Sequence, residues 1–123
     1  MENRLHGSHS FPKRQRLQYN SQFRRVYDNG RRYHGSLAVA YVLAVPDQPR
    51  AAGVVTSRKV GNAVARNRAR RLLREAYRLN QHQFQDHVQI VMVARNSING
   101  KKRHDVEACL RDLFRSAGLL CEA

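Results

Sequence analysis

Arginine side chains are concentrated in one short stretch of this chain, from Ser57 to Arg78. The stretch holds eight basic residues and a single acid, Glu75. At about 100° per residue on a helix, its polar and apolar residues separate onto two sides. The polar side comprises Arg66, Asn67, Arg70, Arg71, Arg74 and Arg78, and the apolar side comprises Ala69, Leu72, Ala76 and Leu79, with Leu73 at its edge. The spacing predicts a helix that buries one face and presents guanidinium groups on the other.

Such a basic face has two interpretations, a solvated surface or a binding surface for an anion. The arginines crowd the first half of the helix, where the positive end of the helix dipole disfavours cations, and few acids are spaced to compensate them. Arginine also accounts for 19 of the 23 basic residues. Its planar fork suits bidentate contact with phosphate, whereas lysine acts more as a point charge. We therefore predict that the face binds nucleic acid.

The composition is that of one basic, folded domain. The 123 residues carry a net charge of +14, and 41% of them are hydrophobic. Such a charge attracts nucleic acid or an anionic membrane surface, and such a hydrophobic content argues against a wholly disordered chain. No apolar run reaches the about 18 residues that span a bilayer, and no signal-peptide pattern begins the chain. We expect a cytoplasmic protein with no membrane partner.

The sequence contains no recognisable catalytic or metal-binding arrangement. Cys109 and Cys121 are expected to be free thiols rather than a disulfide in a reducing compartment. The six histidines form no metal-site spacing with either cysteine, and the carboxylates near the last helix form no cluster that would hold Mg²⁺. We therefore predict no catalytic residue, no metal site and no cofactor on the chain itself.

The order of elements predicts an α+β domain of two layers, with a small central sheet of three to four strands and three helices. Residues 1–13 are expected to be a loose basic tail, and residues 14–120 a single domain. The expected elements are a helix capped by Asn20 or Ser21 and closed by Asn29-Gly30, a strand over 37–45, a hairpin turn over 46–49, a strand over 51–57, a short extended piece over 59–62, the arginine helix from its cap Asn62 to about Asn80, a strand over 88–94, and a last helix capped by Asp105.

Three aromatic residues form a second group of interest. Phe23 and Tyr27 are four residues apart on the first expected helix, and Tyr41 lies in the middle of the first expected strand. Aromatic residues at helix and strand spacing usually belong to the core. Exposed aromatic rings can instead stack on the bases of single-stranded nucleic acid. The spacing alone leaves both roles open.

The chain resembles a known family over roughly residues 14 to 117. The run VGNAVARNRARRLLRE, from Val60 to Glu75, is similar to the arginine-rich signature of the bacterial ribonuclease P protein subunit. Three flanking segments resemble the same family in the same order: RLQYNSQFRRVYDNG from Arg16, GVVTSRK from Gly53 and VQIVMVAR from Val88. The resemblance implies a fold like the second domain of ribosomal protein S5, with a left-handed β-α-β crossover. Sequence pattern alone predicts a right-handed one.

The resemblance also implies a function. A catalytic RNA with bound Mg²⁺ would remove the 5′ leader of precursor tRNA, and this chain would assist it without a further protein partner. The implied contacts with the catalytic RNA are Arg66, Asn67, Arg68, Arg70, Arg71 and Arg74, and those with the leader are Phe23, Tyr27, Tyr41, Ser57, Arg58 and Lys59. A ribosome-associated basic protein and a DNA-binding helix protein remain the alternatives.

Overall fold

A computed structural model describes residues 15–119 of the chain. The predicted tail over residues 1–13, both ends of the predicted 14–120 domain and Cys121 lie outside the described residues. The elements are α2 (Asn20–Asn29), β1 (Arg31–His34), β2 (Ala38–Ala44), β3 (Ala51–Val55), α3 (Ala63–Asn80), β4 (Val88–Ala94) and α4 (Arg103–Ser116), with 3₁₀ turns at Gln81–Gln83 and Asn96–Ile98. The predicted α+β class with a small sheet is confirmed.

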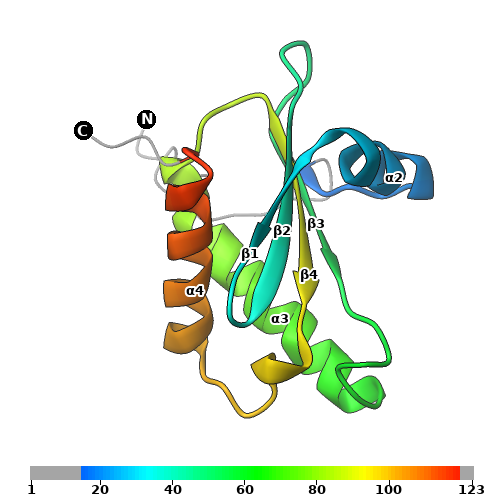
Figure 1. Cartoon of the computed structure of the whole chain (residues 1–123), viewed down its shortest axis with the longest axis vertical. Helices are drawn as coiled ribbons and strands as arrows, with labels where there is room; N and C mark the ends of the chain where they lie inside the picture. The colour runs from blue at the N-terminus through cyan, green and yellow to red at the C-terminus, as the bar shows by residue number, and fades with distance from the viewer. Residues whose placement is uncertain (1–14, 120–123) are drawn as a thin grey trace.

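The strands form one mixed sheet in the order β1-β2-β4-β3. β1 and β4 both pair with β2 in the antiparallel direction, and β3 pairs with β4 in the parallel direction. Helices α3 and α4 cover one face, and α2 crosses the other face near one end (Figure 1). The small residues Ala38, Ala40 and Ala52 lie fully buried on the face toward α3 and α4. The opposite face has a smaller core around Leu17, Val26 and Val91.

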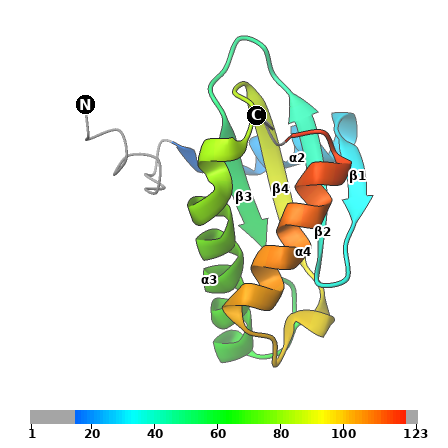
Figure 2. The ribbon, with the colours of Figure 1, turned by 90° about the vertical axis from the view of Figure 1, so that its left-hand side faces the viewer.

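The connection from β3 through α3 to β4 is left-handed. Seen from the side of α3 and α4 (Figure 2), β3 descends, α3 returns in front of the sheet, and β4 descends to the right of β3. The handedness implied by the family resemblance is thus confirmed, and the right-handed crossover favoured by general pattern is wrong for this chain.

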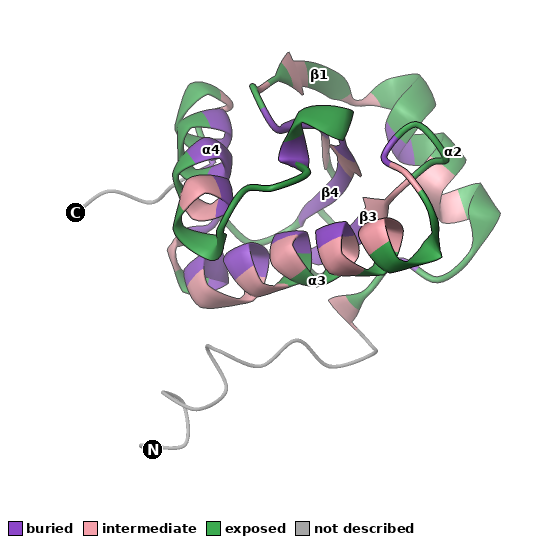
Figure 3. Cartoon of the chain, turned by 90° about the horizontal axis from the view of Figure 1, so that it is seen from below, coloured by how far each residue is buried: buried purple, intermediate pink, exposed green. Residues whose placement is uncertain are grey.

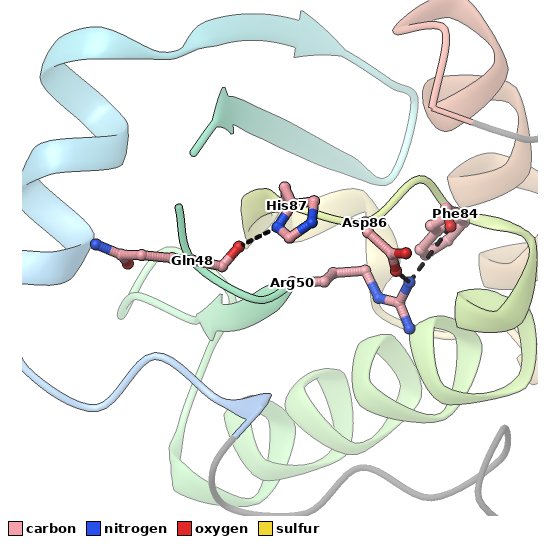
Figure 4. Close-up of polar contacts among 5 residues, drawn as sticks. All are labelled: Gln48, Arg50, Phe84, Asp86 and His87. Atoms are coloured by element: carbon pink, nitrogen blue, oxygen red, sulfur yellow. Dashed lines mark hydrogen bonds and ion pairs between the residues drawn. The ribbon is translucent and has the colours of Figure 1, made fainter. Parts of the chain in front are cut away.

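The turn after β2 does not form the predicted hairpin. Residues Pro46 to Pro49 do turn the chain, but β2 and β3 are not neighbours, because β4 lies between them. Polar contacts hold this connection against the segment before β4 (Figure 4). His87 donates from Nδ1 to the Gln48 carbonyl oxygen at 2.7 Å, and Arg50 contacts the Phe84 carbonyl oxygen at 3.3 Å and the Asp86 carboxylate at 3.4 Å. These contacts fix β3 at the far edge of the sheet.

Five local predictions also need correction. Tyr19, rather than Asn20 or Ser21, occupies the N-cap of α2. The short, charged strand β1 was not predicted, and β3 ends at Val55 rather than at Ser57. Lys59 to Asn62 forms turns rather than an extended piece. Lys102, not Asp105, occupies the N-cap of α4, and the Asp105 carboxylate accepts from the Lys102 backbone N–H at 2.9 Å from inside the first turn. A carboxylate at that position still satisfies an unpaired backbone N–H, so its stabilising role is retained.

The arginine helix α3 begins and ends where predicted. Asn62 caps it, accepting from the Ala65 backbone N–H at 3.0 Å, and the helix ends at Asn80. Its buried stripe is rotated from the predicted one, because α3 packs against both the sheet and α4 (Figure 3). The buried members are Ala69, Leu73, Ala76, Tyr77 and Asn80, whereas Leu72 and Leu79 are half-buried. Leu73, expected at the edge, therefore lies within the buried stripe. Within residues 15–119, no helix combines the length and the apolar character needed to span a membrane.

Tyr77 makes the stability of the fold dependent on pH. Burial raises the pKa of its hydroxyl to about 12, and the neighbouring Arg50 opposes this shift. A phenol that ionises more easily in the unfolded chain stabilises the fold below pH 10 and loses this contribution as the pH rises toward 12. We expect the free energy of unfolding to fall by about 1 kcal/mol from this group by pH 11.

Urea unfolding at pH 9 and pH 11 measures this loss, with Tyr77→Phe as the control. The phenylalanine variant should lack this part of the pH dependence, since it has no hydroxyl to ionise. An identical pH dependence in both proteins would contradict the assignment to Tyr77.

Candidate nucleic-acid interface

The outer side of α3 forms a basic hollow of about 390 Å³. Its lining consists of Arg16, Asn67, Arg70, Arg71, Arg74, Glu75 and Arg78. Arg70 is fixed in place, because it donates to the Asn67 amide oxygen and to the Thr56 hydroxyl, both at 2.8 Å. Thr56 directly follows β3, so Arg70 joins the helix to the end of that strand. Arg71 and Arg74 are exposed. The hollow therefore combines one anchored guanidinium with two that are accessible to a ligand.

Like charges are crowded in this hollow. Partial burial lowers the pKa of Arg74, and the neighbouring Arg16 and Arg70 lower it further. Arginine remains charged at any physiological pH, so the guanidinium groups of Arg16, Arg70 and Arg74 repel one another in addition to the effect of burial. Glu75 is the acidic side chain in the lining, and it binds Arg78 at 2.8 Å. The hydrogen bond from Arg78 lowers the pKa of Glu75. The remaining repulsion favours an anion in the hollow.

Arg66 and Arg68 lie outside this hollow. Arg66 donates to the Gly61 carbonyl oxygen at 2.8 Å, and Arg68 donates to the Lys101 carbonyl oxygen. Both are half-buried on the two flanks of the buried stripe of α3. Of the six residues assigned to this role from the sequence, the structure brings together Asn67, Arg70, Arg71 and Arg74.

A second hollow, of about 360 Å³, adjoins the first at the edge of β3. Its lining consists of Arg16, Leu17, Gln18, Phe23, Ala52, Gly53, Val54 and Arg74. Arg16 and Arg74 line both hollows, so the two hollows adjoin at these side chains, and together they are called the groove. The Leu17 backbone N–H donates to the Ala52 carbonyl oxygen at 2.9 Å, which holds Arg16 beside β3. The sequence interpretation missed Arg16, since nothing local to it indicates that it meets α3.

The predicted aromatic residues border the sheet face that α2 crosses. Phe23 is half-buried against Gly53, with no room for a Cβ atom between the strand and the ring. Tyr27 and Tyr41 meet edge to face, with ring centroids 4.8 Å apart and planes at 86°. Tyr41 is half-buried and packs on the core beneath α2. Burial, then the neighbouring Tyr41, raises the pKa of Tyr27, so its hydroxyl stays neutral. The rings have packing contacts and also retain exposed surface.

Ser57, Arg58 and Lys59 lie in the exposed loop between β3 and α3. This loop is at the opposite end of the sheet from α2 (Figure 1). The Ser57 hydroxyl accepts from the Lys59 backbone N–H at 3.2 Å. Thr56, which binds Arg70, directly precedes these three residues. They therefore lie nearer to the basic hollow than to the aromatic rings. Within residues 15–119, no group of three His, Cys, Asp or Glu side chains is placed to hold a metal ion.

Comparisons with known proteins agree with this geometry. Residues 11–118 match the family model described as Ribonuclease P. The chain is 37% identical over 110 residues to the ribonuclease P protein component of Clostridium acetobutylicum, covering 88% of this chain and 92% of the relative. It is 38% identical over 109 residues to that of Clostridium novyi, covering 87% and 96%.

Solved structures share the same fold. The ribonuclease P protein of Staphylococcus aureus superposes with a TM-score of 0.78 at 23% identity, covering 86% of this chain and 97% of that one. That of Thermotoga maritima gives a TM-score of 0.73 at 24% identity, covering 81% and 96%. At these identities, the likeness establishes the fold alone.

Proposed function

The chain belongs to the ribonuclease P protein family, whose members are subunits of a tRNA-processing endoribonuclease, and we propose that it holds a catalytic RNA and the 5′ leader of precursor tRNA in one groove. The observation that carries the proposal is that the two hollows adjoin and share Arg16 and Arg74 in their linings. A groove lined by cations along its length reduces the repulsion between two polyanions that must approach each other.

The catalytic RNA would dock on the α3 side of the groove. Arg71 and Arg74 are exposed there and can each form charge-assisted hydrogen bonds with phosphate. Arg70 donates to both Asn67 and Thr56, and the bond to Thr56 directs its fork toward the end of β3. Backbone phosphates position an RNA without reading its sequence, so this side supplies affinity and orientation.

The leader would lie on the side of the aromatic rings. Phe23 lines the second hollow, and Tyr27 contacts Tyr41 on the same face of the sheet. These three rings together form the aromatic surface. Stacking on a ring contributes about 1–3 kcal/mol per base whatever the base, which suits substrates of varied leader sequence. In this proposal, Ser57, Arg58 and Lys59 contact phosphates where the leader meets the catalytic RNA.

Hydrolysis would belong to the RNA partner, which would also hold the Mg²⁺ ions. The side chains of this protein would bind and orient the two RNAs. Their contribution is electrostatic, because cations along the groove offset the phosphate charge that would otherwise require more Mg²⁺.

A cleavage assay tests this function. Bacterial ribonuclease P RNA and a 5′-extended precursor tRNA are incubated at low Mg²⁺, with and without the protein. We expect cleavage at the leader junction only when RNA and protein are both present. Tight, salt-sensitive RNA binding without stimulation would instead indicate a ribosome-type binding protein. Preference for duplex DNA would indicate the DNA-binding alternative. The fold argues against that alternative, because strands β3 and β4 precede and follow α3 in the chain, whereas a helix-turn-helix places a second helix there.

Glu75→Gln should strengthen docking of the catalytic RNA by about 2- to 5-fold. The substitution removes the negative charge from the lining of the basic hollow, and one like-charge contact near a surface costs up to about 1 kcal/mol. Filter binding at physiological salt measures the change. Glu107→Gln on α4 is the matched control, because it alters the net charge equally outside the groove. Equal gains in both variants would assign the effect to net charge rather than to the hollow.

A further inference from the structure

Strand β1 carries cations on both faces of one edge of the sheet. Its sequence is Arg31-Arg32-Tyr33-His34, and β1 is the outermost strand on the side away from β3. Tyr33 packs against the core beneath α3 and α4. Since side chains alternate along a strand, Arg31 shares that face, whereas Arg32 and His34 project from the opposite face.

Arg32 is thereby placed beside the aromatic pair. It lies directly opposite Tyr41 in the pairing of β1 with β2, and His34 lies opposite Val39. Directly opposed residues of an antiparallel pair project from the same face, with Cβ atoms about 5 Å apart. Tyr41 in turn meets Tyr27 edge to face. The aromatic surface is therefore bordered by Arg32 on the β1 side and by Arg16 on the β3 side.

The guanidinium of Arg32 has no hydrogen bond or ion pair with any residue in the described part of the chain, and the same holds for Arg31; both side chains are exposed. Charges on an edge strand also discourage edge-to-edge association between molecules. Arg31 and Arg32 would share that role equally. Of these two arginines, only Arg32 lies on the face that holds the aromatic rings. Comparing substitutions of Arg31 and Arg32 therefore separates RNA binding from protection of the sheet edge.

We infer that Arg32 binds a phosphate of single-stranded RNA that has crossed the sheet past Tyr27 and Tyr41. The inference rests on the proposed function, and it extends the leader path from the groove at β3 to the edge at β1. Strands lie about 4.8 Å apart, so the path across three strand spacings is about 14 Å. At about 3.4 Å per phosphate in a stacked strand, this path takes about four nucleotides. The Arg32 contact therefore requires a leader longer than that.

The test compares Arg32→Gln with Arg31→Gln in the complex with ribonuclease P RNA. Equilibrium binding is measured for precursor tRNAs whose leaders have about two and about ten nucleotides, below and above the span of the sheet. We expect Arg32→Gln to weaken binding of the long-leader substrate by about 3- to 10-fold and to reduce the slope of log K against log salt by about 0.7. Binding of the short-leader substrate should not change, and Arg31→Gln should leave both substrates unaffected.

Each other outcome has a defined meaning. Equal effects of the two substitutions, or an equal loss for both leaders, would overturn the Arg32 contact and favour a role in net charge or edge protection. A wild-type complex that binds both substrates equally would contradict leader binding itself, and would therefore reject the proposed function rather than Arg32 alone.

Discussion

Replacement of Arg71 and Arg74 by glutamine together should weaken binding of the catalytic RNA by at least 100-fold at physiological salt. Both side chains are exposed in the basic hollow on α3. A hydrogen bond between charged groups contributes about 1.5–3 kcal/mol, so two lost phosphate contacts account for about 3–6 kcal/mol. The fold should be little affected, because neither position belongs to the buried stripe of the helix.

The matched control is the double variant Arg103→Gln and Arg111→Gln. Both residues are exposed on α4, and their loss changes the net charge by the same amount. Affinities for ribonuclease P RNA are measured by filter binding across a salt series, with urea unfolding as a check on stability. If the α4 variant lost as much affinity as the α3 variant, the protein would be acting through its overall charge, and the assignment of docking to α3 would fail.

Local signals explain why α3 was predicted so closely. The side chain of Asn62 begins the helix by binding the Ala65 backbone N–H, and the helix ends at Asn80. The start and the end of the helix both depend on residues within one or two turns, so they can be predicted directly from the local sequence. The polar side was also predicted to include Asn67, Arg71 and Arg74, and these three are exposed.

The rotation of the buried stripe is set by the elements that pack against α3, not by the sequence of the helix itself. Two neighbours, the sheet and α4, pack against α3 and share its apolar side chains. Leu73 and Tyr77 are buried as a result, and the stripe reaches the flank that carries Arg66. Arg66 and Arg68 then bind the carbonyl oxygens of Gly61 and Lys101. A helical projection treats every arginine alike and does not show which backbone carbonyls approach it.

The joined groove could not be predicted from sequence. Arg16 and Arg74 are far apart in the chain, and they meet only because residues 16 and 17 run beside β3 and α3 packs behind it. That arrangement requires β3 to occupy the sheet edge, with β4 inserted between β2 and β3. The turn at Pro46 to Pro49 is equally compatible with a hairpin. Strand order is set by long-range packing, which no local pattern encodes.

Gly53→Ala should weaken binding of the leader by about 5- to 100-fold while leaving docking of the catalytic RNA intact. A Cβ atom at Gly53 would lie 2.5 Å from the Cε1 and Cζ atoms of Phe23. Such a distance is far inside van der Waals contact, so the ring must move away from the strand. Because stacking on one aromatic side chain contributes about 1–3 kcal/mol, displacing the ring should remove most of that contribution. The loss is measured as the affinity of the complex for precursor tRNA with a leader relative to mature tRNA.

A double-mutant cycle with Phe23→Ala decides whether Gly53 acts through the ring. If the added methyl group only displaces Phe23, then Gly53→Ala should have no further effect on leader affinity once the ring is absent. Additive losses would show instead that Gly53 contacts the leader itself or supports another part of the groove, and the assignment of the Gly53→Ala effect to displacement of the Phe23 ring would be wrong. Removing the ring also removes the two closest contacts of the new methyl group and leaves the Leu17 Cβ atom at 3.3 Å from it. The double variant should therefore unfold at a urea concentration no lower than Phe23→Ala alone, which distinguishes a displaced ring from a strained strand.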